Sequence, residues 1–321
     1  MRLIAVAALI ALAVFLSLNR DPAQAMWDDY ASRLERVLER PIALTPLPPR
    51  KLLAPLDVRR QPLPQTRTSL TKALSLGPCG LVPLIAAHNN SLGKVAPTTA
   101  ELSYTQQALT LARTCRADPA VDPGLIEELD RFIDHRQRLW PLLLSNATDA
   151  APELASYLAA SARALGPNEV EQTGLGGLDD YVQQLRSAAD GQPIDMATLE
   201  AAAQRVQAAP TGGQWINSHR LAVHTLTQLT AALASSELCT GPRTAEQRTL
   251  ARNVFESIYL GRVQPMLAVL ARRGQQLDGL LSDAVLAVDW HPDQLAEAAR
   301  EHAQGWKHVL KRCGLPIGTT G

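Results

Sequence analysis

The sequence contains few aromatic residues and no alternating pattern of apolar and polar residues, and both absences argue against a β-sheet protein. Aromatic residues make up only 4% of its 321 residues, although hydrophobic residues as a whole make up 46%. Strands favour aromatic and β-branched side chains, whereas Ala and Leu, which dominate here, favour helices. We therefore expect an all-α fold, a multi-helix bundle in two halves.

An excess of charge of either sign is also lacking. The chain has 31 basic and 31 acidic residues, so its formal net charge is +0. Proteins that bind nucleic acid mainly through its phosphates need a strongly basic surface. We therefore expect no nucleic-acid partner.

Long hydrophobic runs are absent except at the N-terminus, where residues 3–18 carry no charge. This run follows Arg2 and precedes the small-x-small pattern Ala23-Gln24-Ala25, which is typical of a signal peptide cleavage site. It is shorter than the roughly 20 residues of a membrane-spanning helix. Residues 1–25 therefore predict a cleaved signal peptide, which we favour, or a retained inner-membrane anchor. Either segment would export the chain to the periplasm or cell envelope.

The four cysteines lack the paired CxxC clusters of structural zinc sites. In an oxidising compartment an even number of cysteines indicates disulfides, and four allow three pairings. The expected helix directions favour one disulfide in each half, Cys79–Cys115 and Cys239–Cys313. We expect neither a metal nor a cofactor.

Three segments follow from the pattern of prolines, glycines and apolar residues. Residues 26–66 predict an N-terminal helix and a proline-rich basic linker, and residues 67–321 predict a helical domain. A glycine-rich loop over 166–177 divides that domain into lobes at about 67–165 and 178–313. The expected helices in the domain span residues 67–76, 79–89, 98–117, 123–146, 152–164, 178–189, 195–208, 214–237, 244–273, 276–287 and 292–313.

The proline-rich linker carries Arg50, Lys51, Arg59 and Arg60 against a single acid, Asp57. One interpretation is a basic stalk beside an anionic membrane surface. The other is an extended linker strapped across the helical body, which is the interpretation we favour because scattered surface charges are common.

Several motifs are similar to those of an uncharacterised proteobacterial family, the domain-of-unknown-function family numbered 3080. They are Cys79-Gly80-Leu81, Asn89-Asn90-Ser91-Leu92-Gly93-Lys94-Val95, Cys115 and Tyr259-Leu260-Gly261-Arg262-Val263-Gln264-Pro265. The resemblance covers about 29–313. It implies an exported envelope protein, often a lipoprotein, but no activity. This chain has no cysteine before Cys79 to carry a lipid, and it has Ala87 and His88 where members often have charged residues.

The polar residues of these motifs are the candidate binding residues: Asn89, Asn90, Ser91, Lys94, Arg262 and Gln264. Ser91 and Lys94 also match the S-x-x-K pattern, in which a lysine amine activates a serine nucleophile. Gly93 interrupts the helix that this chemistry requires, and the sequence contains no Lys-Thr-Gly. We therefore favour a helix end closed by Gly93, with Asn89 to Ser91 in capping hydrogen bonds.

The histidines do not predict a metal site. His219 and His224 are five residues apart, so they point in different directions around a helix. His302 lies on an apolar helix face, which favours a buried histidine with one hydrogen bond.

Two functional hypotheses remain after these exclusions. The first is an exported helical protein that binds or supports another envelope protein or a cell-wall component without catalysis. The second is a periplasmic hydrolase or acyl-transfer enzyme that uses Ser91 and Lys94. We favour the first because the catalytic pattern is so short.

Overall fold

A computed structural model describes residues 21–64, 76–89, 98–240, 242–281 and 290–315. Within these ranges every regular element is helical and no β-strand occurs, so the predicted all-α class is confirmed. No helix in the described part of the chain is long and apolar enough to cross a membrane.

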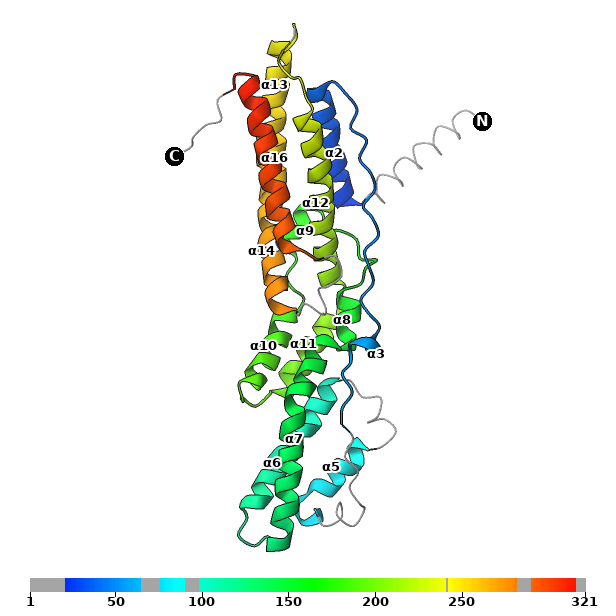
Figure 1. Ribbon diagram of the computed structural model, residues 1–321, viewed down its shortest axis with the longest axis vertical. Helices are drawn as coiled ribbons and strands as arrows, with labels where there is room; N and C mark the ends of the chain where they lie inside the picture. Colours follow the sequence, from blue (N-terminus) through cyan, green and yellow to red (C-terminus); the bar gives the residue numbers. More distant parts are fainter. Residues whose placement is uncertain (1–20, 65–75, 90–97, 241, 282–289, 316–321) are drawn as a thin grey trace, which may run out of the picture.

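The molecule is elongated, with a helical bundle at one end and a smaller helical tip at the other (Figure 1). The helices are α2 (Pro22–Leu38), α3 (Leu56–Arg59), η1 (Gly77–Cys79), α5 (Leu81–His88), α6 (Thr98–Ala117), α7 (Pro123–Asp149), α8 (Pro152–Tyr157), α9 (Pro167–Gln172), α10 (Leu178–Ala189), α11 (Met196–Ala208), α12 (Thr211–Ala234), α13 (Thr244–Val254), η3 (Phe255–Val263), α14 (Gln264–Leu280) and α16 (Pro292–Arg312). We call the end formed by α2, α12, α13, α14 and α16 the upper bundle, and the end formed by α5 with the adjoining parts of α6 and α7 the distal tip.

The buried hydrophobic residues form two clusters rather than one. The larger fills the upper bundle and the middle of the molecule, and the smaller lies in the distal tip. Along α7 the change from one cluster to the other falls between Ile133 and Leu139, close to Pro141 inside the helix. The glycine-rich segment 166–177 lies within the larger cluster, because Val170 and Leu175 are buried there. The predicted lobes 67–165 and 178–313 remain a prediction as folding units.

Helix α2 begins before residue 26, where the predicted N-terminal helix and linker segment began. Its first residue is Pro22, and the Asp21 carboxylate accepts a hydrogen bond of 2.9 Å from the Ala23 amide. An aspartate N-cap followed by proline is a strong helix start. Ala23 and Trp27 are both buried against the upper bundle. The small-x-small pattern at residues 23–25 therefore lies inside the first turns of α2.

Other predicted boundaries also differ from the structure; the helix expected over 152–164, for example, ends at Tyr157 in α8. The helices expected over 244–273 and 276–287 are one continuous rod from α13 through η3 to α14, because Gly274 is buried against Trp290 and does not end the helix. Within that rod η3 is a π-helix. The loop expected over 166–177 contains the short helix α9. The helix expected over 67–76 and the end of the one expected over 276–287 lie outside the described residues.

The proline-rich residues 40–64, which we call the strap, run along one side of the molecule from the end of α2 to the distal half (Figure 1). Arg50 donates to the carbonyl of Leu158, and Arg59 donates to that of Asp149. Apolar side chains of the strap pack against the main core at Ile42, Leu44, Leu47, Leu53 and Leu63. These contacts confirm that the strap lies across the helical body.

Both disulfides match the pairing expected from helix direction. Cys79–Cys115 ties η1 to the end of α6, with 5.3 Å between the Cα atoms. Cys239–Cys313 ties the segment after α12 to the end of α16, with 5.1 Å between the Cα atoms. The first closes the distal tip and the second closes the upper bundle.

Candidate functional site

The structure separates the motif residues that the sequence analysis singled out. Asn89 ends α5 in the distal tip, whereas Arg262 lies in η3 and Gln264 begins α14 in the upper bundle, where both are exposed (Figure 1). The two motifs therefore do not form one site. Asn90, Ser91 and Lys94 lie outside the described residues, so their binding and catalytic roles remain predictions.

A polar and aromatic cluster surrounds the end of α5 in the distal tip. The ring of His88 stacks on that of Tyr104, with 3.8 Å between the ring centres and 17° between the planes. The Nε2 atom of His88 lies 2.5 Å from the Glu101 carboxylate and donates to it, while Nδ1 lies 3.3 Å from the side-chain oxygen of Asn89. Neighbouring residues from α5 and α6 thus hold the imidazole in one orientation.

Arg136 of α7 completes this cluster over the Tyr104 ring. Its guanidinium lies 4.6 Å from the ring centre and donates a 3.1 Å hydrogen bond to the phenol oxygen. Burial raises the pKa of Tyr104, Arg136 lowers it, and Glu101 raises it again, and the net direction is upward. The phenol therefore stays neutral at ordinary pH. Three helices contribute to one stack of histidine, tyrosine and arginine.

A shallow depression of about 240 Å³ lies beside this stack. Its polar lining comes from His88, Glu101, Ser103, Gln107 and Glu200, the last contributed by α11. Two carboxylates, a hydroxyl and an amide therefore border the same hollow. Carboxylate oxygens accept hydrogen bonds from ammonium and hydroxyl groups, which gives the depression the chemistry to hold a ligand of that kind.

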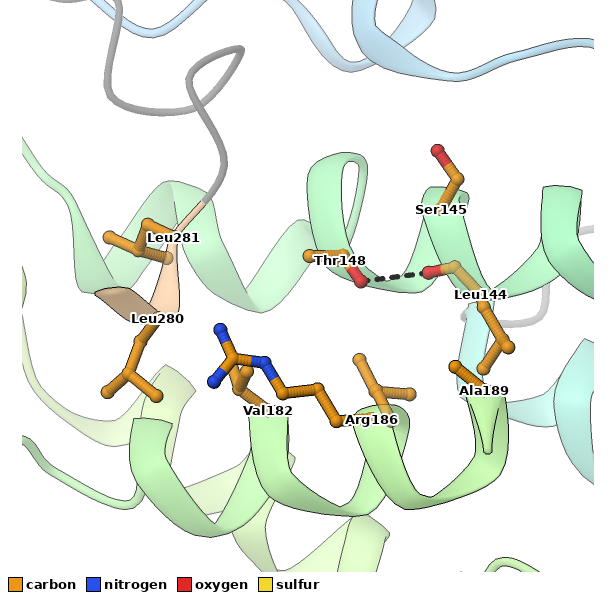
Figure 2. Close-up of a pocket in the computed structure, with 9 residues that line it drawn as sticks. Leu144, Ser145, Thr148, Val182, Arg186, Ala189, Leu280 and Leu281 are labelled. Carbon is orange, nitrogen blue, oxygen red and sulfur yellow. Dashed lines mark hydrogen bonds between the residues drawn. The ribbon is translucent and has the colours of Figure 1, made fainter. Parts of the chain in front are cut away.

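A second hollow of about 280 Å³ lies between α7, α10 and α14 (Figure 2). Arg186 extends across it and donates to the carbonyl of Gly279. The Thr148 hydroxyl donates to the Leu144 carbonyl within the same helix at 2.9 Å, and the Ser145 hydroxyl donates to Asp149. The lining of this hollow is mostly apolar and contains no carboxylate, so we place the candidate site at the distal tip and not here.

The three histidines considered in the sequence analysis contact other residues of the fold. His302 is fully buried and has two hydrogen-bond partners, Tyr30 at 2.5 Å and Thr230 at 2.9 Å, one more than expected. His219 is buried against Trp290, whereas His224 contacts Thr45 of the strap at the surface, so the two point apart as predicted. In the described ranges no group of three or more His, Cys, Asp or Glu side chains could hold a metal ion.

The residues that complete the tip cluster were not singled out from the sequence. Glu101 is the last residue of the helix-capping pattern Thr98-Thr99-Ala100-Glu101. In the structure its carboxylate contacts His88, which lies on another helix. Tyr104 follows Glu101 by three residues, so the two side chains lie on the same face of the helix. This spacing was the signal in the sequence that could have identified them together. Arg136 comes from α7, and its place against Tyr104 depends on how α6 and α7 pack.

Comparison with protein-family models gives one match that covers most of the chain. The model described as "Protein of unknown function (DUF3080)" matches residues 27–317. This range includes both disulfides, the upper bundle and the distal tip. Comparisons with curated proteins and with solved structures found no match. The chain therefore belongs to the DUF3080 family of proteins of unknown function.

Proposed function

We propose that this protein is an exported component of the cell envelope that binds a cell-wall polymer through the depression at its distal tip, without catalysing a reaction. The observation that carries this proposal is the convergence of Glu101 and Glu200 on a hollow bordered by the His88–Tyr104 stack. The stacked His88 ring holds the Glu101 carboxylate in place through a hydrogen bond, and preorganised groups lose little entropy on binding.

Export is supported by the disulfides. Both pairs of cysteines are joined in the structure, and protein disulfides persist mainly in oxidising compartments such as the periplasm. The apolar segment at residues 3–18 agrees with this destination, whether it is removed or kept as an anchor.

A cell-wall polymer suits the chemistry of the depression. Such a polymer offers hydroxyl groups on its sugars and ammonium groups on its peptides. Glu101 and Glu200 can accept from both kinds of group, and Ser103 and Gln107 can donate as well as accept. Each charge-assisted hydrogen bond contributes more to binding than a neutral one does. The acidic lining thus favours an ammonium-bearing ligand over an anionic one.

The experiment is co-sedimentation of the full-length protein, kept soluble in detergent, with purified cell-wall sacculi. We expect the unmodified protein to sediment with the sacculi and E101Q/E200Q to bind at least about tenfold more weakly, which corresponds to one lost charge-assisted hydrogen bond. The matched control is E297Q/E301Q, which removes two exposed carboxylates from α16 at the other end of the molecule.

Equal binding of the two double variants would show that the distal tip is not the binding surface. Absence of any sedimentation by the unmodified protein would refute the cell-wall ligand. The enzymatic hypothesis has a separate test, because S91A should abolish activity if Ser91 is a nucleophile and leave envelope function intact if it is not.

A further inference from the structure

The strap carries the two most exposed large hydrophobic side chains among the described residues. Leu52 is 79% exposed and Val58 is 71% exposed, whereas Leu111 and Leu260 are only 37% and 39% exposed. Ala54 and Pro55, which lie between the first two, are exposed as well. Single exposed apolar residues are ordinary, but here several lie within seven consecutive residues of the strap.

Basic residues flank this apolar segment on both sides. Arg50 and Lys51 precede it, Arg59 and Arg60 follow it, and Asp57 is the only acid between them. Arg50 and Arg59 hold the strap to the body through carbonyl groups, while Lys51 and Arg60 are exposed. Apolar side chains beside exposed cations are typical of segments that lie in the interface of an anionic membrane.

The first described residues of the chain lie on the same side of the molecule as the strap. Pro22 lies against Gly166, where an added Cβ would come within 2.7 Å of the Pro22 side chain, and Asp21 interacts electrostatically with Arg163. Arg50 of the strap reaches the carbonyl of Leu158, just before these residues in the chain. Figure 1 shows the start of α2 and the strap on the same side of the molecule.

The packing of residues 21–25 also favours a retained N-terminal segment. Cleavage after Ala25 would remove the Asp21 cap of α2 and the buried side chain of Ala23. A chain kept intact would carry the apolar residues 3–18 directly before Asp21. That segment would then enter a bilayer on the side of the molecule along which the strap runs.

From these observations we propose that the strap surface around Leu52 and Val58 docks onto an anionic lipid bilayer, so that the protein lies with this side against the membrane that holds its N-terminus. Leu52 and Val58 enter the interface, and Lys51 and Arg60 contact lipid headgroups. This surface is separate from the distal tip, so the proposal does not depend on the proposed cell-wall ligand.

The test is hydrogen–deuterium exchange of the full-length chain inserted into vesicles. Amides in residues 51–58 should exchange several-fold more slowly in phosphatidylglycerol vesicles than in phosphatidylcholine vesicles. L52E/V58E should abolish this protection. L111E, which places a single glutamate on an exposed site of α6, should leave it unchanged.

Three results would overturn the proposal. Equal exchange of residues 51–58 in the two vesicle types would refute docking onto anionic lipid. Unchanged protection in L52E/V58E would show that these side chains do not enter the interface. Protection that rises with protein concentration in detergent, without vesicles, would assign the surface to a second copy of the chain.

Discussion

His302 joins two other helices through both of its ring nitrogens. Trp306 donates to the Tyr30 hydroxyl at 2.7 Å, so that hydroxyl is free to donate its own proton to Nε2 of His302. Nδ1 then carries the imidazole proton and donates to Thr230 at 2.9 Å. This chain of bonds satisfies a neutral imidazole and leaves no acceptor for a second proton. Burial lowers the pKa of His302 to about 3.

This arrangement predicts that the protein loses stability as the pH falls. Burial lowers the pKa of His219 to about 4 as well, whereas an unfolded histidine titrates near pH ~6.5. Below pH ~6.5 the unfolded chain binds protons that the folded chain excludes, so acid favours unfolding. By pH ~4 each histidine should reduce the free energy of unfolding by about 3 kcal/mol.

Urea unfolding at several pH values between 7.5 and 4 measures this effect. H302Q should reduce the slope of stability against pH relative to the unmodified protein, because one of the two buried groups no longer titrates. The same slope in both proteins would mean that His302 is not held neutral by its surroundings.

Gly213 is the residue that fixes how closely α12 approaches the segment after α8. A Cβ at this position would lie 2.3 Å from the carbonyl oxygen of Ala159, a backbone atom that has little room to move. G213A should therefore destabilise the protein by about 2 kcal/mol through overpacking. G279A is the control, because nothing lies within 4 Å of its added Cβ and alanine favours the helix, so it should raise stability by roughly 0.5 kcal/mol. Thermal unfolding of both variants measures these changes, and equal effects would contradict the packing argument.

At the scale of elements, the sequence pattern predicted the long regular helices well. It did not predict the short helix α9 or the π-helix η3. The bounds expected for 98–117 and 178–189 are those of α6 and α10. Helix α9 was missed because Gly166 and the glycines at 174–177 outweighed its short apolar pattern. Nothing in the hydrophobic periodicity of Phe255–Val263 distinguishes a π-helix from an α-helix.

The strap illustrates the same limit of prediction from sequence. Its composition predicts an extended backbone but not the residues that this backbone contacts. Asn146 of α7 is buried and exchanges two hydrogen bonds with the backbone of Gln61, one of 2.8 Å and one of 2.9 Å. N146A should release this part of the strap and accelerate tryptic cleavage after Arg60. S145A removes a 3.2 Å bond donated by the Gln61 side chain and a 3.2 Å bond to Asp149 within α7, but it leaves both backbone bonds of Gln61 in place and should not accelerate cleavage. Equal cleavage rates in the two variants, measured by timed digestion and mass spectrometry, would show that Asn146 does not anchor the strap.

At the scale of the whole molecule, the cluster of side chains in the distal tip could not be predicted from the sequence pattern. Its formation depends on tertiary packing. His88 and Asn89 were noticed through a family motif, but Glu101, Tyr104 and Arg136 lie on two other helices. Their convergence follows from the packing of α5, α6 and α7 around the second hydrophobic cluster. The disulfides were predictable because helix direction alone decides which cysteines share an end.

The disulfide of the upper bundle should contribute strongly to stability. Cys239 and Cys313 are separated by 74 residues, so their bond restricts a long loop in the unfolded chain. By chain entropy this stabilises the fold by about 4 kcal/mol. C239A/C313A should unfold at a correspondingly lower urea concentration than the unmodified protein, and an unchanged midpoint would contradict this estimate.

An exported, doubly disulfide-bonded envelope protein is the central claim, and intact mass spectrometry tests it most directly. The protein would be purified from the envelope fraction without reductant, and its mass measured before and after reduction. We predict a gain of about 4 Da on reduction, two hydrogens for each disulfide, with no thiol available to an alkylating reagent beforehand. No change in mass, with four thiols alkylated before reduction, would contradict the assignment to an oxidising compartment.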